Sequence, residues 1–240
     1  MSQRLDQELV RRNLATTRSQ AENLIKLGLV RVDAAHVTKP GALVAQHAKI
    51  TVETDERFVS RAALKLASVA HDLGIHFTGA TMLDVGSSTG GFTDYALQQG
   101  ATKVIAVDVG TQQLHPSLRD NPKIELHEQT DIRDVHELST PTQLVVIDVS
   151  FISLREILPA VARLVSRDAV VLAMVKPQFE AEQSSLKHKG VIKNDHIRRN
   201  ILKDFENWVQ KLFIIQKKMD SQVAGGKGNV ERFYVLKKVH

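Results

Sequence analysis

The sequence predicts an α/β fold with a mostly parallel sheet, preceded by a small α+β domain. From residue 57 onward, segments with helical spacing alternate with short apolar runs, which is typical of parallel strands covered by helices. Residues 1–56 show two helical segments followed by short strand-like segments. The acidic cluster at residues 53–56 separates these two patterns. We therefore expect a small domain over residues 1–56 and a larger one over residues 57–240.

The composition is that of an ordinary globular chain. Its 240 residues are 42% hydrophobic and 25% charged, which suits one domain or two small ones. No apolar run approaches the roughly 18 residues of a membrane span and no signal sequence follows Met1, so we expect a cytoplasmic protein without a membrane partner. The absence of cysteine excludes disulfides, thiolate nucleophiles and cysteine-based zinc sites. Ten histidines without metal-binding spacing predict no metal site.

The net charge of +5 is distributed unevenly along the chain. Residues 1–50 carry 8 basic and 4 acidic side chains, residues 57–170 carry 10 and 13, and residues 171–240 carry 14 and 7. Basic ends around an acidic centre suit a protein that holds a polyanion such as RNA with its periphery. A charge excess that only keeps the protein in solution explains the same distribution equally well.

Two helices and then short strands are expected in the small domain. The spacing of leucine, isoleucine and valine predicts helices over residues 4–13 and 18–27, and Gly28 fits the end of the second helix. Alternating apolar and polar residues predict strands over residues 29–33 and 49–52.

This domain resembles the small RNA-binding fold named after a ribosomal protein of the small subunit. The resemblance is carried by residues 4–6, 17–21, 24–32 and 37–40. In that family the helix pair presents basic side chains to structured RNA, which implies an RNA-binding role for Arg4, Arg11, Arg12, Arg18 and Lys26. For any one of them, a solvated helix face is the alternative. Family members usually carry Asn-Gly at the turn where this chain has Asp33-Ala34-Ala35.

The larger domain is expected to alternate helices and strands along its whole length. Its pattern predicts strands over residues 81–85, 103–108, 123–127, 143–149, 169–175, 213–218 and 232–238. Helices are predicted over residues 57–73, 91–99, 153–165 and 195–212. Ser153 opens a capping box that Glu156 completes, so Ser153 is explained as a helix start rather than as a nucleophile.

A glycine-rich turn joins the first of these strands to the next helix. Glycines let the backbone approach a ligand, and the helix start adds unpaired N–H groups. The dinucleotide fingerprint lacks its middle glycine because Ser87-Ser88 follow Gly86, and the phosphate loop lacks its lysine because Phe92 follows Gly91. The remaining D-x-G-x-x-x-G pattern resembles the S-adenosylmethionine loop of Rossmann-like methyltransferases. The resemblance implies a cofactor site formed by Asp84, Gly86, Ser87, Ser88, Thr89, Gly90, Gly91 and Phe92.

Two further acids follow the next two strands. Asp108 ends the second strand about 20 residues after the loop, where a carboxylate accepts hydrogen bonds from ribose hydroxyls. Asp131 follows the third strand, and the resemblance implies that it accepts from the adenine amino group.

Charged residues stand at the ends of two neighbouring apolar strands. Asp148 ends one strand and Lys176 ends the next, so both are expected at the carboxyl edge of the sheet, where open α/β folds bind ligands. Charges at such positions are costly unless they meet, which predicts an ion pair over the cofactor. Lys65 lies in the helix before the first strand, and Glu231 begins the last strand.

The order Lys65, Asp148, Lys176, Glu231 resembles the K-D-K-E tetrad of FtsJ-like 2′-O-ribose methyltransferases. The sequence segments around these four residues are similar to those of the TlyA family, whose members often carry the label hemolysin. The similar segments are residues 60–66, 148–154, 175–180 and 228–231. The resemblance covers essentially the whole chain.

The resemblance implies a Rossmann-like class I methyltransferase with a mostly parallel seven-stranded sheet. It further implies catalysis by the four charged residues, S-adenosylmethionine as the cofactor, and ribosomal RNA or ribosomal subunits as the partner. The implied targets are cytidine riboses in 16S rRNA, 23S rRNA or both. Two other functions stay open: an RNA-binding ribosome-assembly factor without catalysis, and a hemolysin, which the missing membrane span disfavours.

The chemistry of ribose methylation gives each charged residue a role. A ribose 2′-hydroxyl is a poor nucleophile, so it must be positioned and must lose its proton as the bond to the methyl group forms. Lys176 is the expected contact of that hydroxyl. It acts either as a partly neutral base, which burial beside Lys65 favours, or as a cation that orients the hydroxyl. We expect Phe92, Phe151 and Phe179 to belong to the core or a pocket wall rather than to stack on bases.

Overall fold

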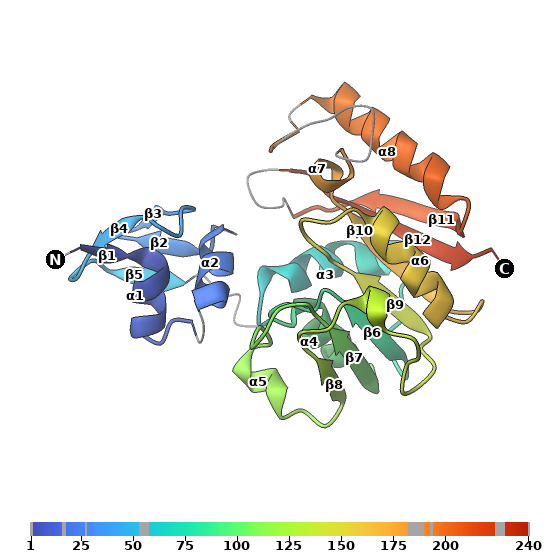
Figure 1. Ribbon diagram of the computed structural model, residues 1–240, viewed down its shortest axis with the longest axis horizontal. Helices are drawn as coiled ribbons and strands as arrows, with labels where there is room; N and C mark the ends of the chain where they lie inside the picture. Colours follow the sequence, from blue (N-terminus) through green and yellow to red (C-terminus); the bar gives the residue numbers. More distant parts are fainter. Residues whose placement is uncertain are drawn as a thin grey trace.

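The chain forms two parts, which a computed structural model describes over residues 2–15, 18–26, 28–52, 58–181, 190–192, 194–223 and 229–239 (Figure 1). The side chains of Ser19, Gln20, Asn23 and Lys26 lie outside this description. Among the described residues, no helix combines the length and the apolar character needed to cross a membrane.

The N-terminal part packs two helices against short antiparallel strands. Its elements are β1 (Ser2–Arg4), α1 (Leu5–Arg11), α2 (Arg18–Lys26), β2 (Val30–Val32), β3 (Ala35–His36), β4 (Leu43–Ala45) and β5 (Ile50–Val52). β1 pairs with β4, and β2 lies between β3 and β5. Leu5, Leu9 and Ile25 are fully buried in its core. The two predicted helices and the strands around residues 30–32 and 50–52 are confirmed. Strands β1, β3 and β4 were not predicted, because none of these two- or three-residue segments alternates between apolar and polar residues as β2 does.

The turn between β2 and β3 keeps a tight hairpin geometry without glycine. Asp33 has φ 48° and Ala34 has φ 70°, and both central residues of a two-residue type I′ hairpin need positive φ. The Asp33 carboxylate accepts the Lys49 N–H at 2.8 Å, and the Asp33 N–H donates to the Lys49 carbonyl at 2.9 Å. These contacts to β5 hold the turn where Asn-Gly would otherwise be expected.

The larger part is built around one seven-stranded sheet. Along the chain its elements are α3 (Arg61–Leu73), β6 (Thr81–Val85), α4 (Gly91–Gln98), β7 (Lys103–Val107), α5 (Pro116–Arg119), β8 (Ile124–His127), the 3-10 helix η1 (Ile132–Asp134), β9 (Leu144–Ile147), α6 (Leu154–Leu164), β10 (Val170–Val175), α7 (Pro177–Glu180), α8 (Asp195–Val209), β11 (Phe213–Asp220) and β12 (Arg232–Lys238). The strand order is β11-β12-β10-β9-β6-β7-β8, and only β12 runs against its neighbours. The predicted mostly parallel sheet is confirmed.

The strand order reverses between β6 and β9. From β6 the chain continues outward through β7 and β8, and it then returns to β9 and continues through β10 on the other side. Such a switch point leaves a crevice at the carboxyl ends of the two central strands, where open α/β sheets bind ligands. The loops after β6 and β9 therefore lie together at the place where a ligand is expected.

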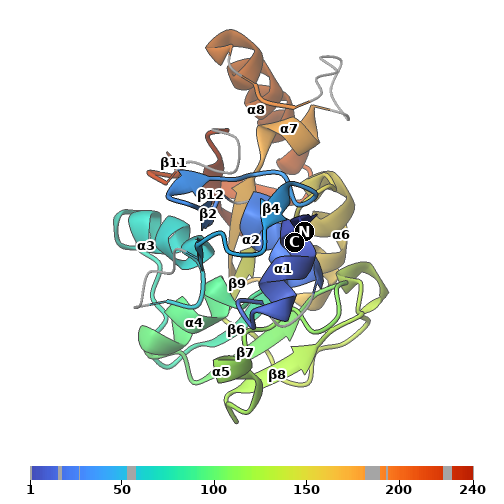
Figure 2. The same cartoon turned by 90° about the vertical axis from the view of Figure 1, so that its left-hand side faces the viewer.

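Helices cover both faces of the sheet (Figure 2). One face packs against α3 and α4, with Leu66 and Phe92 meeting Met82, Val146 and other strand residues. The other face packs against α6 and α8 through residues such as Leu158 and Phe205. Because successive strand residues point to opposite faces, Leu83 and Val85 contact the second layer while Asp84 points to the first.

The helices of the larger part differ from the prediction mainly at α3, α8 and α7. α3 begins at Arg61 rather than at residue 57, because residues 58–60 are non-helical and Ser60 is extended, with φ −160° and ψ 160°. α8 ends at Val209, and residues 210–212 form turns. The four-residue helix α7 directly after Lys176 was not predicted, since its first position is a proline and it is too short to show a period. The predicted cap of α6 is confirmed, because the Ser153 hydroxyl accepts the Arg155 N–H at 3.1 Å.

Candidate active site at the carboxyl edge of the sheet

Three strands bring charged residues to one edge of the sheet. Asp148 follows β9 and Lys176 follows β10, so both leave the carboxyl ends of neighbouring parallel strands. β12 runs in the opposite direction, so Glu231, just before it, lies at the same edge. Val175 pairs with Arg232 in this register, which makes Lys176 and Glu231 the next facing positions.

The four predicted catalytic residues form two ion pairs. The Lys176 Nζ lies 2.5 Å from the Asp148 Oδ1, and the Lys65 Nζ lies 2.6 Å from the Glu231 Oε2. Exposed fractions are 9% for both lysine side chains, 16% for Asp148 and 4% for Glu231. Charges this deeply buried are costly without a partner. The sequence predicted the first of these pairs, and the structure adds the second.

Ser150 belongs to this cluster and was missed in the sequence. Its hydroxyl accepts a hydrogen bond from the Lys176 Nζ at 2.7 Å. The side chain therefore shares one ammonium with Asp148, two residues earlier in the same loop. That spacing is the available sequence signal, but a lone serine two residues after a strand end is too common to be chosen without the fold.

The loop that carries Ser150 also exposes an aromatic ring. Phe151 has a positive φ of 66° and is 83% exposed, although a bulky side chain rarely adopts this conformation. Its ring lies 5.2 Å from the ring of Phe179, centroid to centroid. Phe92 is buried in the core as expected, whereas Phe151 lies outside the core, so of the two places expected for it only a pocket wall remains.

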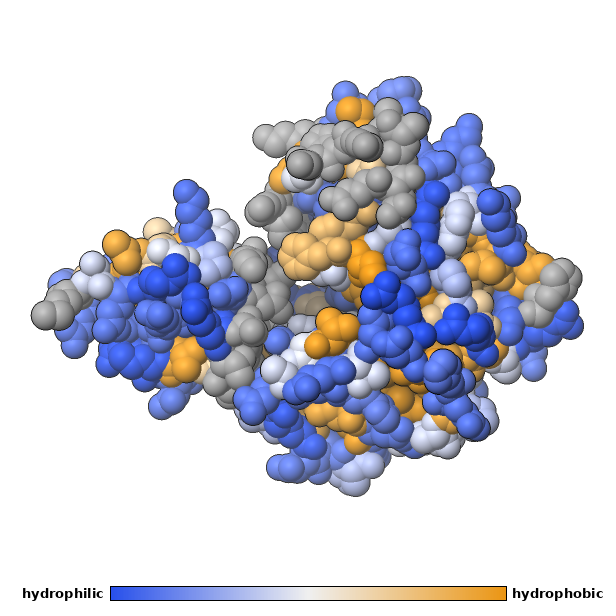
Figure 3. All heavy atoms as spheres, viewed as in Figure 1, coloured by the Kyte–Doolittle hydropathy of each residue, from blue (hydrophilic) through white to orange (hydrophobic). Residues whose placement is uncertain are grey.

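Apolar side chains adjoin the site at three loops. On the face seen in Figure 3, apolar residues form separate patches on a largely hydrophilic surface. Among the exposed large hydrophobic residues, Val109 follows Asp108, Phe151 follows the Asp148 loop and Val230 precedes Glu231. Exposed apolar groups beside buried charges are typical of a binding site.

Glycine is required in the turn after β6 for reasons of space. A Cβ at Gly86 would lie 2.7 Å from the backbone oxygen of Asp148, and φ there is +82°. A Cβ at Gly90 would lie 2.6 Å from Leu114, and one at Gly91 would lie 2.1 Å from the Ser60 hydroxyl. Real Cβ contacts are longer, so the loop closes against three neighbouring segments only because these residues lack side chains.

Asp108 holds this turn from the next strand. Its Oδ2 accepts the Ser88 N–H and its Oδ1 accepts the Gly110 N–H, both at 2.7 Å. Ser87 and Thr89 are buried within the turn, and the Ser87 hydroxyl lacks a hydrogen-bond partner. The Phe92 side chain packs into the core 6.2 Å from the Phe233 ring, so only its backbone faces the turn.

Asp84 is fully buried beneath the turn. Its Oδ2 accepts the Thr93 hydroxyl at 2.6 Å, whereas its Oδ1 has no hydrogen-bond partner. Burial, and to a smaller extent the nearby Asp148 and Asp108 carboxylates, raises the pKa of Asp84 to about 7 against the opposing effect of the Thr93 hydrogen bond. An unpartnered buried carboxylate oxygen is costly, and a cationic group of a ligand would satisfy it. These residues therefore fit an S-adenosylmethionine molecule, which carries an ammonium and a sulfonium.

Asp131 lies farther along the same edge. Its carboxylate accepts the Arg133 N–H at 2.9 Å, which starts η1, and pairs with the Arg133 guanidinium at 2.6 Å. This guanidinium lowers the pKa of Asp131. Thr130, the residue before it, donates its N–H to the Asp108 carbonyl at 2.9 Å, so the backbone links the two acids.

Four of the five predicted RNA-binding residues gather around two buried acids. Arg4 and Arg18 contact Asp6 at 2.8 and 3.0 Å, while Arg11 and Arg12 contact Glu8, each at 2.6 Å. These arginines lower the pKa of both acids to about 2. Arg12 also donates to the carbonyls of Ala48 and Gln46, so it connects α1 to the segment between β4 and β5. The side chain of Lys26 lies outside the described residues.

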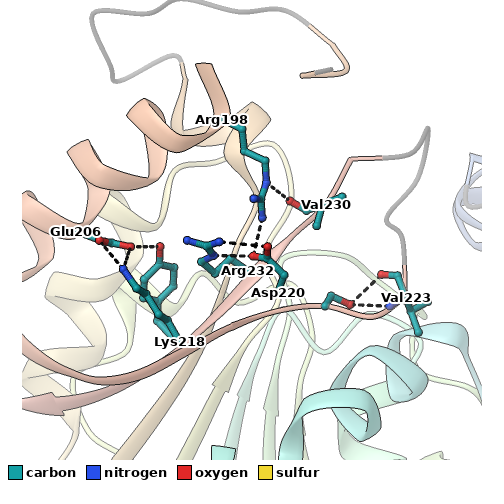
Figure 4. A network of polar contacts seen from close by, with 9 residues as sticks. Arg198, Glu206, Lys218, Asp220, Val223, Val230 and Arg232 are labelled. Carbon is teal, nitrogen blue, oxygen red and sulfur yellow. Dashed lines mark hydrogen bonds and ion pairs between the residues drawn. The ribbon is translucent and has the colours of Figure 1, made fainter. Parts of the chain in front are cut away.

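A polar network fixes the chain on both sides of Glu231 (Figure 4). Asp220 accepts from Arg232 and from Arg198, each at 2.6 Å, and the Arg198 Nε donates to the Val230 carbonyl at 3.1 Å. The Ser221 N–H donates to the Glu231 carbonyl at 2.9 Å. Helix α8, which supplies Arg198, thus holds the segment that presents Glu231 to Lys65.

Comparison with known proteins matches both parts of the chain. Residues 58–238 match the FtsJ-like methyltransferase family and residues 3–50 match the S4 domain. The chain is 40% identical over 240 residues to the 16S/23S rRNA (cytidine-2'-O)-methyltransferase TlyA of Mycobacterium tuberculosis, covering 98% of this chain and 89% of the relative. It is 33% identical over 235 residues to Hemolysin A of Brachyspira hyodysenteriae, covering 95% and 97%.

A solved structure supports the same assignment. A hemolysin-named protein from Streptococcus thermophilus has a TM-score of 0.75 and 33% sequence identity, covering 99% of this chain and 88% of that one. The family match spans more than half of the chain, and these relatives align over most of their length. The chain therefore belongs to the TlyA family of FtsJ-like methyltransferases and carries an N-terminal S4 domain.

Proposed function

We propose that this methyltransferase uses S-adenosylmethionine to methylate a ribose 2′-hydroxyl in ribosomal RNA. The observation that carries the proposal is the pair of buried ion pairs, Lys176 with Asp148 and Lys65 with Glu231, beside the glycine turn. The name of the M. tuberculosis relative supports cytidine in 16S or 23S rRNA as the target. A ribosomal substrate also agrees with the expected cytoplasmic location.

The turn after β6 and the acids beside it would hold the cofactor. When bound, S-adenosylmethionine supplies an electrophilic methyl group on a sulfonium. The free Oδ1 of Asp84 and the backbone of residues 86–91 suit its methionine end, and Asp108 and Asp131 suit its ribose and adenine. Asp108 keeps acceptor capacity for this role, because each carboxylate oxygen can accept more than the one N–H it receives here.

Lys176 is proposed to contact the reacting hydroxyl. A lysine ammonium has three N–H donors; the Lys176 Nζ donates one to Ser150 and would need a second for its ion-pair partner Asp148. The third remains for the ribose 2′-oxygen, where it would orient the nucleophile and stabilise the negative charge that develops as the proton leaves. Both neighbours of the Nζ are acceptors, which favours this orienting role over that of a neutral base.

The S4 domain is proposed to hold the RNA through its arginine clusters. Glu8 is paired with two arginines, so its cluster keeps one unit of positive charge, whereas in the Asp6 cluster Arg18 also pairs with Glu22 at 3.4 Å, which balances the charges there. Arg4, Arg11 and Arg18 remain 42%, 51% and 56% exposed. Guanidinium groups held in fixed positions suit bidentate contacts with phosphates.

The test is methyl transfer to defined RNA substrates. The protein would be incubated with radiolabelled S-adenosylmethionine and unmodified small subunits, large subunits or free ribosomal RNA, and label would be mapped to base or ribose. The Lys176→Ala variant removes the proposed contact. Lys237→Ala is the matched control, because Lys237 lies at the far end of β12 and donates to the Asp168 carbonyl.

We expect ribose label that disappears in Lys176→Ala and persists in Lys237→Ala. Cofactor binding without label on any of these substrates would favour an assembly factor that keeps the fold without turnover. Absence of cofactor binding would overturn the proposal. A liposome-leakage assay on the same preparation tests the function that the name hemolysin suggests.

A further inference from the structure

We propose that Glu180 is a positioning residue for methyl transfer, because its buried carboxylate joins the loop of Lys176 to the loop of Asp148 and Ser150. The inference rests on the function proposed above. Glu180 lies at the end of α7 and is 1% exposed. It does not pair with Lys176, so any effect on the reaction is indirect.

Two short hydrogen bonds connect Glu180 to the start of α6. Its Oε2 accepts the Ser153 hydroxyl at 2.6 Å, and its Oε1 accepts the Leu154 N–H at 2.7 Å. Ser153 itself caps α6 through the Arg155 N–H. The carboxylate thus satisfies donors at the helix start that would otherwise be buried and unpaired.

These hydrogen bonds close a ring of contacts around the site. On one side, Lys176 directly precedes α7. Its backbone carbonyl accepts the Phe179 N–H at 2.9 Å and the Glu180 N–H at 3.3 Å, which fixes the backbone of the lysine relative to Glu180. On the other side, the chain runs from Asp148 through Ser150 to Ser153. The Lys176 Nζ bridges the two loops at one end, Glu180 bridges them at the other, and the Phe151 and Phe179 rings meet between them.

Further residues stabilise the buried carboxylate from the side away from the reaction. The Arg155 Nε lies 3.7 Å from the Glu180 Oε2, and the same guanidinium pairs with Asp204 at 2.8 Å. It also lies over the Trp208 ring at 5.6 Å. Burial raises the pKa of Glu180, which these partners oppose. A hydrogen-bonded carboxyl group is therefore buried at the junction of the two loops, where an apolar contact would pack them without fixing their register.

Methyl transfer at this site requires precise placement of the Lys176 Nζ. The Lys176 Nζ must lie within hydrogen-bonding distance of Asp148, Ser150 and the substrate oxygen together, and a displacement of about 1 Å can lower a rate by about a hundredfold. Without Glu180 the two loops would keep the Nζ contact and the ring contact but lose the bond that sets their spacing.

The experiment compares Glu180→Ala with Glu180→Gln. Glutamine keeps a carbonyl for the Leu154 N–H, and its amide can donate to the Ser153 hydroxyl, so it should retain most activity. We expect Glu180→Ala to lower kcat at least about tenfold, with unchanged affinity for S-adenosylmethionine and an unchanged KM for RNA. Gln143→Ala is the matched control, because the Gln143 Oε1 accepts the Thr81 N–H at 2.7 Å at the amino edge of the sheet, opposite the catalytic loops.

A double-mutant cycle separates positioning from general stability. If Glu180 acts by placing Lys176 against Ser150, Ser150→Ala lowers kcat much less in the Glu180→Ala background than in the wild type. Ser150→Ala should be additive with Gln143→Ala. If Glu180→Ala fails to fold, a cycle of Ser153→Ala with Ser150→Ala replaces it, since Ser153→Ala removes one of the two bonds to Glu180.

Two results would overturn the inference: full kcat in folded Glu180→Ala, or additivity in the cycle that is measured. An equal loss of kcat in Gln143→Ala would assign the effect to stability alone and overturn the inference as well. Failure of the proposed function has a different signature, since wild-type protein would then place no label on ribose.

Discussion

Asp84 shows how one buried side chain links the stability of the protein to pH. Its pKa in the folded chain is about 7, well above the value of 3.8 of an ordinary aspartate, chiefly because of burial. Between these values the folded state holds a proton that the unfolded state has lost. The free energy of unfolding must therefore decrease as pH rises from about 4 to about 7.

We expect the unliganded protein to lose at least about 1.4 kcal/mol of stability between pH 5 and pH 7, since one unit of pKa shift corresponds to this amount. Urea denaturation at several pH values measures it. Asp84→Asn keeps the shape and a hydrogen bond to Thr93 while removing the titration, so its stability should vary less with pH in this range. If the free energy of unfolding changed equally with pH in the two proteins, Asp84 would not titrate between pH 5 and pH 7.

The same carboxylate should couple cofactor binding to proton release. A cationic group next to the free Oδ1 favours the ionised form, so the folded protein gives up the proton when the cofactor binds. The affinity for S-adenosylmethionine is expected to rise with pH up to about 7. Calorimetry in two buffers with different ionisation enthalpies should show proton release in the wild type and less in Asp84→Asn; equal release in both proteins would contradict the assignment.

At the scale of structural elements, the turn after β6 depends on Gly86, because the backbone of Asp148, after β9, packs directly against it. Gly86→Ala places a methyl group 2.7 Å from the Asp148 backbone oxygen at a φ of +82°. Gly79→Ala is a matched control, because Gly79 has a φ of +74° but nothing lies within 4 Å of its added Cβ.

Both glycine variants should lose about 1–2 kcal/mol through their backbone conformation. Gly86→Ala should lose more than Gly79→Ala, and it alone should weaken cofactor binding and methyl transfer, because the clash displaces Asp148. Thermal unfolding and a cofactor titration measure both effects. Equal behaviour of the two variants would mean that the turn accommodates a side chain.

The hairpin between β2 and β3 offers the opposite case, an alanine where glycine would fit better. Ala34 adopts a φ of +70°, which costs an alanine roughly 1 kcal/mol relative to a conformation it prefers. Ala34→Gly is expected to stabilise the S4 domain by up to about 1 kcal/mol. Ala35→Gly, in β3, should destabilise it instead. Denaturation of the full chain, followed by amide exchange in residues 30–52, distinguishes the two; a loss of protection in Ala34→Gly would contradict the prediction.

At the scale of the whole molecule, the RNA binding proposed for the arginines of the S4 domain predicts how affinity depends on salt. Arg11 is half exposed and paired with Glu8, whereas Arg12 also supports two backbone carbonyls. We expect Arg11→Ala to weaken binding of different RNA sequences uniformly and to reduce the slope of log affinity against log salt by about 1. Arg163→Ala, on α6, should change neither. An unchanged slope in Arg11→Ala would mean that the ion pair with Glu8 has no contact with phosphate.

The boundary between the two domains was predicted near residue 56 and stays a prediction, because residues 53–57 are not described. The pattern within each part was readable for a simple reason. Apolar positions repeat every second residue in strands and every third or fourth in helices, so each element of five or more residues leaves a period in the sequence. The two residues of β3 and the four of α7 leave none.

The sequence by itself determined the α/β class, the two-domain pattern, the glycine turn and the order Lys65, Asp148, Lys176, Glu231, because these depend on residue types at short spacings. Only the tertiary structure decided that Lys65 pairs with Glu231, that Ser150 shares the Lys176 ammonium and that Glu180 joins the two loops. It also decided that the arginines of the S4 domain surround buried Asp6 and Glu8. These contacts join residues from different elements or depend on which side chains become buried, and strand order, register and burial are set by the packed fold.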